Sequence, residues 1–192
     1  MMRIRITLAA VAISIFATLS TSHHAVAFQS RDHLTPQEVE LVKEAQILDQ
    51  RMDIFVKAAD RRLMVITGST ASNAKQLKKD SQKWGELPSG SRAELIADIA
   101  KILDEAITNI DDVSLRDEKN PLIPKALRKL AAEATRIMEQ LKPFHEQVKG
   151  DAEIASFASL TENAESILDA AKKLPPPTEK TKAKNDKSKE KQ

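Results

Sequence analysis

The residues from Leu34 to Thr67 carry an apolar side chain at nearly every third or fourth position, and no glycine or proline lies among them after Pro36. Steps of three and four place these side chains on one face of an α-helix, whose period is 3.6 residues. The positions of this stripe are Leu41, Ala45, Leu48, Met52, Phe55, Ala59, Leu63 and Ile66. The pattern predicts one long amphipathic helix, onto which the later parts of the chain fold.

The start of this stretch carries a helix-capping signal. Thr35 is a good N-cap residue, Pro36 suits the first helical position, and Glu38 follows the cap by three residues. Threonine and glutamate at this spacing form a capping box, in which each side chain bonds an otherwise unpaired backbone N–H group. The polar residues that we expect on the other faces of the helix, with Asp53 and Lys57 as a four-apart ion pair, are Asp49, Gln50, Asp53, Lys57, Asp60 and Arg61.

The first 27 residues have the organisation of a secretory signal peptide. Arg3 and Arg5 precede an apolar run from Leu8 to Leu19, and Ala25-Val26-Ala27 supplies small residues for cleavage. The alternative is a retained membrane anchor, but the apolar run is shorter than the ~20 residues that span a bilayer. We therefore expect cleavage after Ala27, export to the periplasm or the extracellular space, and no stable membrane span in the mature protein.

The charge of the mature chain argues against nucleic acid as a partner. Residues 1–27 contain two of the 30 Lys and Arg residues and no acid, so 28 basic and 28 acidic side chains remain. The body, residues 28–174, carries a formal charge of −3, and the segment 175–192 carries +3 from six lysines and three acids. A protein that binds nucleic acid presents a broad basic face, which this body lacks.

Composition also separates a folded body from a tail. The chain has no cysteine, so disulfides and thiolate chemistry are excluded, and stability must come from burial of apolar side chains. Residues 28–174 are long enough for one such core. Residues 175–192 contain three prolines and no apolar side chain larger than Ala183, which predicts a disordered Lys-rich tail. This tail is either a charged spacer or an arm that touches an anionic surface.

Three further long helices and one short helix are predicted after Gly68. A short helix ends at Trp84, and a second capping box at Ser91 and Glu94 opens a long helix that runs to about Glu118. The next helix runs from about Pro124 to Lys149, with a kink or a break where Pro143 removes a backbone hydrogen bond. The last begins at Gly150–Asp151 and packs through Ile154, Phe157, Ala158, Leu160, Ala164, Ile167, Leu168 and Ala171. The predicted fold is all-α: an up-and-down bundle of four long helices plus one short helix.

No residue is nominated as a catalytic, cofactor-binding or metal-binding residue. The mature chain has two histidines, His33 and His145, and neither belongs to a Glu-x-x-His or His-Glu-x-x-His motif. No Gly-x-Ser-x-Gly turn or phosphate-binding glycine cluster occurs. The adjacent acids Asp104-Glu105, Asp111-Asp112 and Asp117-Glu118 point in different directions on a helix, which favours a solvated face. The only tryptophan, Trp84, is interpreted as a hydrophobic plug over the end of the bundle.

Two resemblances follow from these residues. With Leu34-Thr35-Pro36-Gln37-Glu38 behind a signal peptide and Asn109-Ile110-Asp111-Asp112 in a later helix, the chain looks like uncharacterised, secreted, all-helical bacterial proteins. Leu34-Thr35 also resembles the start of the Leu-Thr-x-x-Gln motif of periplasmic stress chaperones of the Spy/CpxP type. Here the glutamine, Gln37, stands one place early, and the motif has no second copy. The second resemblance implies binding of unfolded envelope proteins.

The sequence therefore predicts a non-enzymatic, exported helical protein of the cell envelope that binds a protein partner or a second copy of itself. A holdase-like chaperone of the Spy/CpxP type is one alternative. An envelope hydrolase with an unrecognised site is another.

Overall fold

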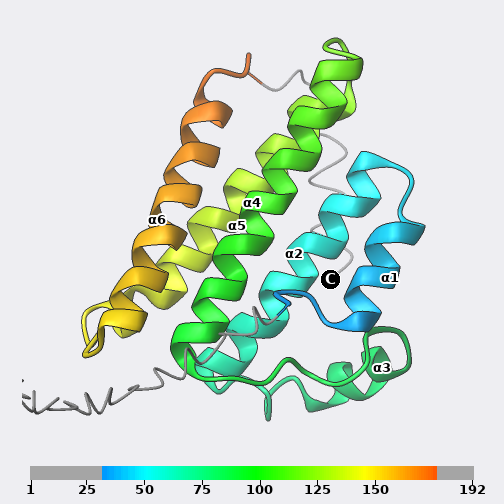
Figure 1. Ribbon diagram of the computed structural model, residues 1–192. Helices are drawn as coiled ribbons and strands as arrows, with labels where there is room; N and C mark the ends of the chain where they lie inside the picture. The colour runs from blue at the N-terminus through cyan, green and yellow to red at the C-terminus, as the bar shows by residue number, and fades with distance from the viewer. Residues whose placement is uncertain (1–31, 177–192) are drawn as a thin grey trace, which may run out of the picture. The chain divides into compact units, whose positions relative to one another are not determined.

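The computed structural model describes residues 32–176, and the regular secondary structure of this range is entirely helical (Figure 1). The predicted all-α class is therefore confirmed for these residues. The predicted signal peptide and the tail beyond Pro176 lie outside the described residues. The helices are α1 (Pro36–Glu44), α2 (Leu48–Thr67), α3 (Ala74–Trp84), α4 (Arg92–Arg116), α5 (Leu122–His145) and α6 (Asp151–Lys172).

The prediction of one helix from Leu34 to Thr67 is wrong, because the chain turns between α1 and α2. Ala45 and Ile47 both adopt extended backbone conformations, and α1 folds back alongside α2 (Figure 1). The guanidinium of Arg51 holds the turn, since its Nε and Nη2 donate to the Ala45 carbonyl at 3.0 and 2.9 Å. Tertiary contacts therefore override a local sequence that favours a continuous helix.

The apolar stripe predicted for this stretch does face the core. Met52, Phe55 and Ala59 are almost completely buried, and α2 packs against both α4 and α5. Helix α4 also contacts α5 and α6, and α5 contacts α6. The core between these four helices consists of Leu, Ile, Ala, Met and Phe side chains, so burial of apolar surface supplies its main stabilisation.

Both predicted capping boxes are present. Thr35 and Glu38 cap α1, and Ser91 and Glu94 cap α4. Helix α5 continues through Pro143 to its end at His145, so the predicted break at this proline is absent. Pro143 lies two residues before the end of α5, so the backbone bond that it cannot donate to the Glu139 carbonyl is lost close to the helix terminus.

The predicted place of Ile154 in the core is wrong. Its side chain is 56% exposed, whereas Phe157, Leu160 and Ser156 of the same helix are buried. At ~100° per residue, Ile154 lies about 120° around the helix from Leu160, outside the stripe that faces α4 and α5. Ser156 occupies the buried position instead, and its hydroxyl donates to the Ala152 carbonyl at 2.8 Å.

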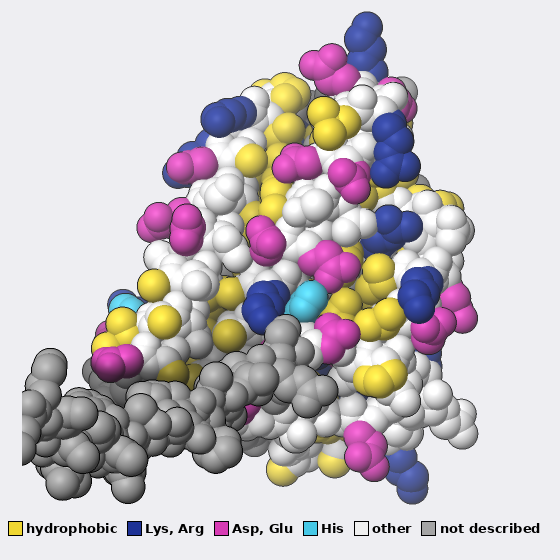
Figure 2. Space-filling model, in the orientation of Figure 1, with side chains coloured by type: hydrophobic (Ala, Val, Ile, Leu, Met, Phe, Trp, Pro, Cys, Tyr) yellow, Lys and Arg dark blue, Asp and Glu magenta, His cyan; other side chains and the backbone are white. Residues whose placement is uncertain are grey.

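The predicted ion pair between Asp53 and Lys57 is also replaced by pairs between different helices. Lys129 of α5 donates to Asp53 at 2.6 Å, and Lys57 lies 2.9 Å from Asp80 of α3. Charges of both signs intermingle over the face drawn in Figure 2, with hydrophobic side chains between them. Partners on neighbouring helices thus compete successfully with partners one turn away.

An ion pair joins the beginnings of α4 and α6 and makes stability depend on pH. Arg92 donates to both carboxylate oxygens of Glu153, and its guanidinium lies 5.7 Å from the centre of the Phe144 ring. The hydrogen bond from Arg92 holds the pKa of Glu153 below its ordinary value of 4.5. A carboxyl whose pKa is lower in the folded protein than in the unfolded chain stabilises the folded protein at pH values above its unfolded pKa. This contribution to the free energy of unfolding is lost as the pH falls through the lower, folded-state pKa.

We predict that Glu153→Gln lowers the free energy of unfolding at about pH 6, by roughly 1 kcal/mol because the pair is partly exposed. The difference from the parent protein should shrink at an acidic pH well below 4.5, because Glu153 is then protonated. Urea unfolding followed by circular dichroism at both pH values measures it. Arg92→Gln should show the same pH dependence, and a difference that stays constant with pH would contradict the assignment.

Candidate functional site

A cluster of buried charges joins α1, α2 and α4. Glu38 is fully buried, and its Oε1 accepts from Arg61 Nε at 3.1 Å and from Arg62 Nη1 at 2.8 Å. Its Oε2 lies 2.8 Å from Arg62 Nη2, so the two terminal nitrogens of Arg62 bind the two carboxylate oxygens in a bidentate pair. Asp98 of α4, also buried, lies 3.8 Å from Arg62 Nε. Two cations and two anions thus balance inside the protein.

Arg61 extends this cluster to the connection between α3 and α4. Its Nη2 donates to the carbonyl oxygens of Trp84, Gly85 and Glu86, and its guanidinium lies 5.8 Å from the centre of the Trp84 ring. Burial lowers the pKa of Arg61, and the charge of Glu38 opposes this shift. Since an arginine stays protonated in proteins, the cluster is a set of fixed charges.

Gly85 fits this connection for two reasons. Its φ of 65° lies in the left-handed region, and a Cβ there would lie 2.9 Å from the Gln37 side chain. Glycine is the residue that accepts this backbone conformation without steric conflict. The α3–α4 connection therefore approaches α1 closely, and the clamp formed by Glu38, Arg61 and Arg62 holds the two together.

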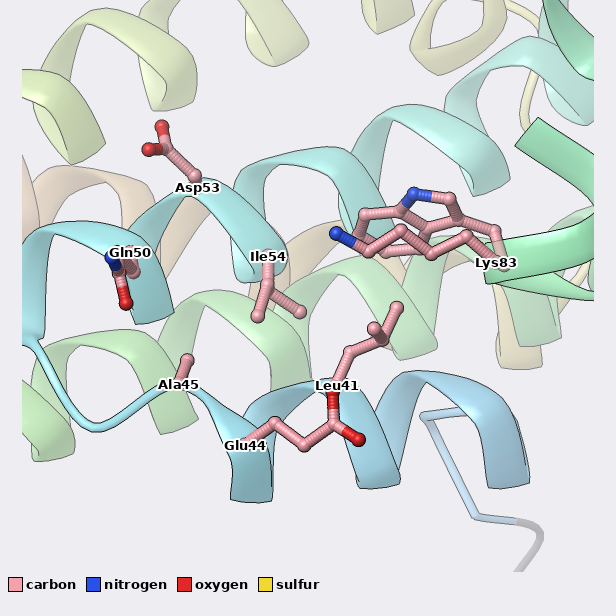
Figure 3. Close-up of a pocket in the computed structure, with 8 residues that line it drawn as sticks. Leu41, Glu44, Ala45, Gln50, Asp53, Ile54 and Lys83 are labelled. Carbon is pink, nitrogen blue, oxygen red and sulfur yellow. The ribbon is translucent and has the colours of Figure 1, made fainter. Parts of the chain in front are cut away.

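A groove of about 460 Å³ opens beside this clamp, between α1, α2 and α3. In Figure 3, Leu41 of α1 and Ile54 of α2 point toward one another across it, and the Lys83 side chain reaches in from α3. Its lining is completed by Glu44, Ala45, Gln50, Asp53 and Trp84. The groove is thus lined by apolar side chains together with polar and charged groups of both signs.

Trp84 lies at this groove, with its side chain largely buried. It is the last residue of α3, a helix whose backbone lies close to α1 and whose side chains also contact α2, as in the pair of Lys57 with Asp80. The sequence indicated a buried Trp84 but placed it over the end of a bundle. It instead joins α3 to the α1–α2 pair, because Arg61 binds its carbonyl and lies over its ring.

The two histidines are in different environments. His33 Nε2 lies 2.7 Å from Glu105 Oε2, and the His33 carbonyl accepts from Arg62, so His33 belongs to the edge of the buried cluster. His145 makes an edge contact with the Phe157 ring, 4.8 Å between centroids, beside a mainly apolar cavity of about 310 Å³. Of the adjacent acids in α4, Glu105 thus pairs with His33, and Asp112 lies 4.0 Å from Arg116 one turn away.

Two further properties concern the described residues alone. Between residues 32 and 176, no three or more His, Asp or Glu side chains are grouped so that they could hold a metal ion. The six helices of this range include none that combines the length and the apolar character needed to cross a bilayer.

The chain was compared with protein-family models, with curated proteins and with solved structures, and none of the three comparisons gives a match. A function can therefore be inferred only from the residues of this chain and their arrangement.

We predict that Glu38→Gln lowers the free energy of unfolding by about 3–5 kcal/mol, because it leaves two buried arginines with one carboxylate. Glutamine can still serve in the capping box, so the loss reports the ion pairs. The control is Glu40→Gln on the same helix, where an exposed carboxylate pairs with Lys43 at the surface. It should change stability by less than about 0.5 kcal/mol. Equal effects of the two substitutions in chemical unfolding would contradict this account.

Proposed function

We propose that this protein is a non-enzymatic, exported helical protein of the cell envelope that binds a protein segment in the groove between α1, α2 and α3. The observation that supports binding is the groove itself, where Ile54 lies with the largely buried Leu41 and Trp84 among polar and charged groups of both signs. Its volume of about 460 Å³ lies in the range of ligand-binding clefts. The predicted signal peptide supports export.

We also infer that the four long helices form an up-and-down bundle, to which α1 and α3 are added. The contacts of α4 with α2, α5 and α6 support this arrangement. In this organisation the bundle is a rigid support, and the groove lies outside the bundle core, where it can admit a partner. A site on rigid elements is favourable for recognition because little conformational entropy is lost on binding.

The chemistry of the groove defines the segment that it would accept. A bulky apolar side chain would lie between Leu41 and Ile54, and a neighbouring cationic side chain would face Glu44 at the rim. Lys83 would face an acidic side chain of the segment on the other side of this apolar side chain. A helix with one apolar face flanked by charges of both signs would meet these requirements. Amphipathic helices of this kind commonly bind in grooves of their partner proteins.

A holdase-like chaperone is the second candidate. The observation in its favour is that α1, which begins at the Leu34-Thr35 sequence shared with the Spy/CpxP type, forms one wall of the groove. A holdase would bind many different unfolded proteins through the same apolar surface. A protein with one dedicated partner would bind that partner alone, at a fixed stoichiometry. Suppression of client aggregation by the purified protein distinguishes the two.

A photo-crosslinking residue at Gln50 tests the proposal in the native host, with a residue at Ile154 of α6 as the control. We expect a partner to be captured at position 50 and not at position 154. The purified partner should then change the fluorescence of Trp84, the only tryptophan, and Ile54→Asp should weaken its binding by roughly tenfold or more. Ile154→Asp should leave the affinity unchanged.

Equal capture at the two positions would contradict the proposal. So would an affinity for the captured partner that does not respond to Ile54→Asp, because this substitution places a charge in the apolar part of the groove. Circular dichroism of both aspartate variants checks that they retain the helical fold.

A further inference from the structure

The turn between α1 and α2 is not encoded by its own residues. Ala45, Gln46 and Ile47 include no glycine or proline, and the apolar stripe of α1 continues into α2 at helical spacing. Helix α2 begins without a side-chain cap, since its N-cap residue is Ile47, which is 49% exposed. A sequence of helix formers with a poor N-cap favours a continuous helix over a turn. The turn therefore depends on contacts made elsewhere.

Those contacts are confined to one face of α1. Among the helices of the described range, α1 contacts α2 and α3 alone. Its buried side chains are Glu38 and Leu41, and a groove of about 430 Å³ lies between Pro36 and Glu40 of α1 and Lys83 of α3. Val39 and Val42 are partly buried against the core, and the side chain of Glu38 is the most completely buried of α1.

The site that α1 occupies requires a carboxylate. If α1 leaves, Arg61 and Arg62 lose the acid that both of them bind. A continuous helix would place Glu38 roughly 35 Å from Arg61, because 23 residues separate them at ~1.5 Å per residue. With a helical linker, Glu38 cannot reach the arginines of its own chain. A second copy of α1 supplies the same carboxylate and the same apolar side chains.

We propose that two copies of this chain exchange their N-terminal arms, residues 32–44. In the exchanged dimer the linker 45–47 is helical, so that α1 and α2 form one helix in each copy. Glu38 of each copy then binds Arg61 and Arg62 of the other. The dimer restores the ion pairs of Glu38 with Arg61 and Arg62, and it exchanges the bonds from Arg51 to the Ala45 carbonyl for the helical conformation that the linker sequence favours. The exchange is separate from the binding of another protein in the groove.

Two substitutions of the same exposed residue test the linker. Asparagine at position 47 is a good N-cap and a poor interior helix residue, whereas alanine is the reverse. Since a dimer contains two linkers, Ile47→Ala should favour dimerisation over Ile47→Asn on the order of 100-fold. The proteins are incubated in dilute urea to allow exchange, returned to buffer over a range of concentrations, and analysed by light scattering. Equal dimerisation of the two variants, or no dimer for Ile47→Ala at any concentration, would overturn the proposal.

A second measurement identifies the contact that joins the copies. Glu40 and Glu44 of α1 lie with Lys83 of α3 around one groove, where a carbodiimide can join a carboxylate to the amine. When chains of two isotopic compositions are mixed and exchanged, the dimer should give crosslinked peptides that combine both isotopes. The monomer fraction should give crosslinks within one isotope and serves as the control. Crosslinks of one isotope only in the dimer would show that the copies associate through another surface, and the proposal would fail.

Discussion

The structure depends on one buried carboxylate that two arginines share. Glu38 lies at the point where α1, α2 and the α3–α4 connection meet, and it binds Arg61 and Arg62 through both oxygens. Because Arg61 also binds three backbone carbonyls of the connection, the same ion pairs hold α3 in place. The turn at residues 45–47, the position of Trp84 and the groove therefore share one cause.

Burial of charge makes this arrangement specific rather than merely stable. Removing charged groups from water is unfavourable, and the attraction between them compensates only when the geometry is good and the remaining polar atoms are paired. Here Oε2 of Glu38 also accepts the Thr35 backbone N–H at 2.9 Å, and Arg62 also donates to the Ala58 carbonyl at 2.8 Å. Arg62 Nε is the exception, because it makes no hydrogen bond and has Asp98 at 3.8 Å. A helix without an acid at the position of Glu38 would leave two buried arginines with Asp98 as the remaining carboxylate of the cluster. The site therefore selects α1 or a close copy of it.

The all-helical class and the beginnings of α1 and α4 could be predicted because their signals are local. Capping boxes at Thr35 and Ser91 and apolar stripes with a helical period need no knowledge of distant residues. The turn could not be predicted, because residues 44–48 favour a helix and the contacts that bend them come from Arg51 and the clamp. An extended helix and a bent one share the same apolar stripe.

The candidate site was missed for a related reason. Glu38 was recognised as a capping residue and Arg61 was assigned to a polar face, and each assignment is reasonable within one helix. Arg61 and Glu38 are 23 residues apart, and the groove draws its lining from three helices. The one available signal was an arginine pair, Arg61-Arg62, within an otherwise amphipathic segment. Trp84 was expected to be buried, but its neighbours depend on the turn.

The central claim is that Glu38 and Arg62 stabilise the fold through one another. A double-mutant cycle measures this directly, with free energies of unfolding for the parent protein, Glu38→Gln, Arg62→Gln and the double variant. The account predicts a coupling energy of about 2 kcal/mol or more, because the second substitution removes a charge that the first has left unpaired. Additive effects within about 0.5 kcal/mol would contradict it and show that the turn is held by other contacts.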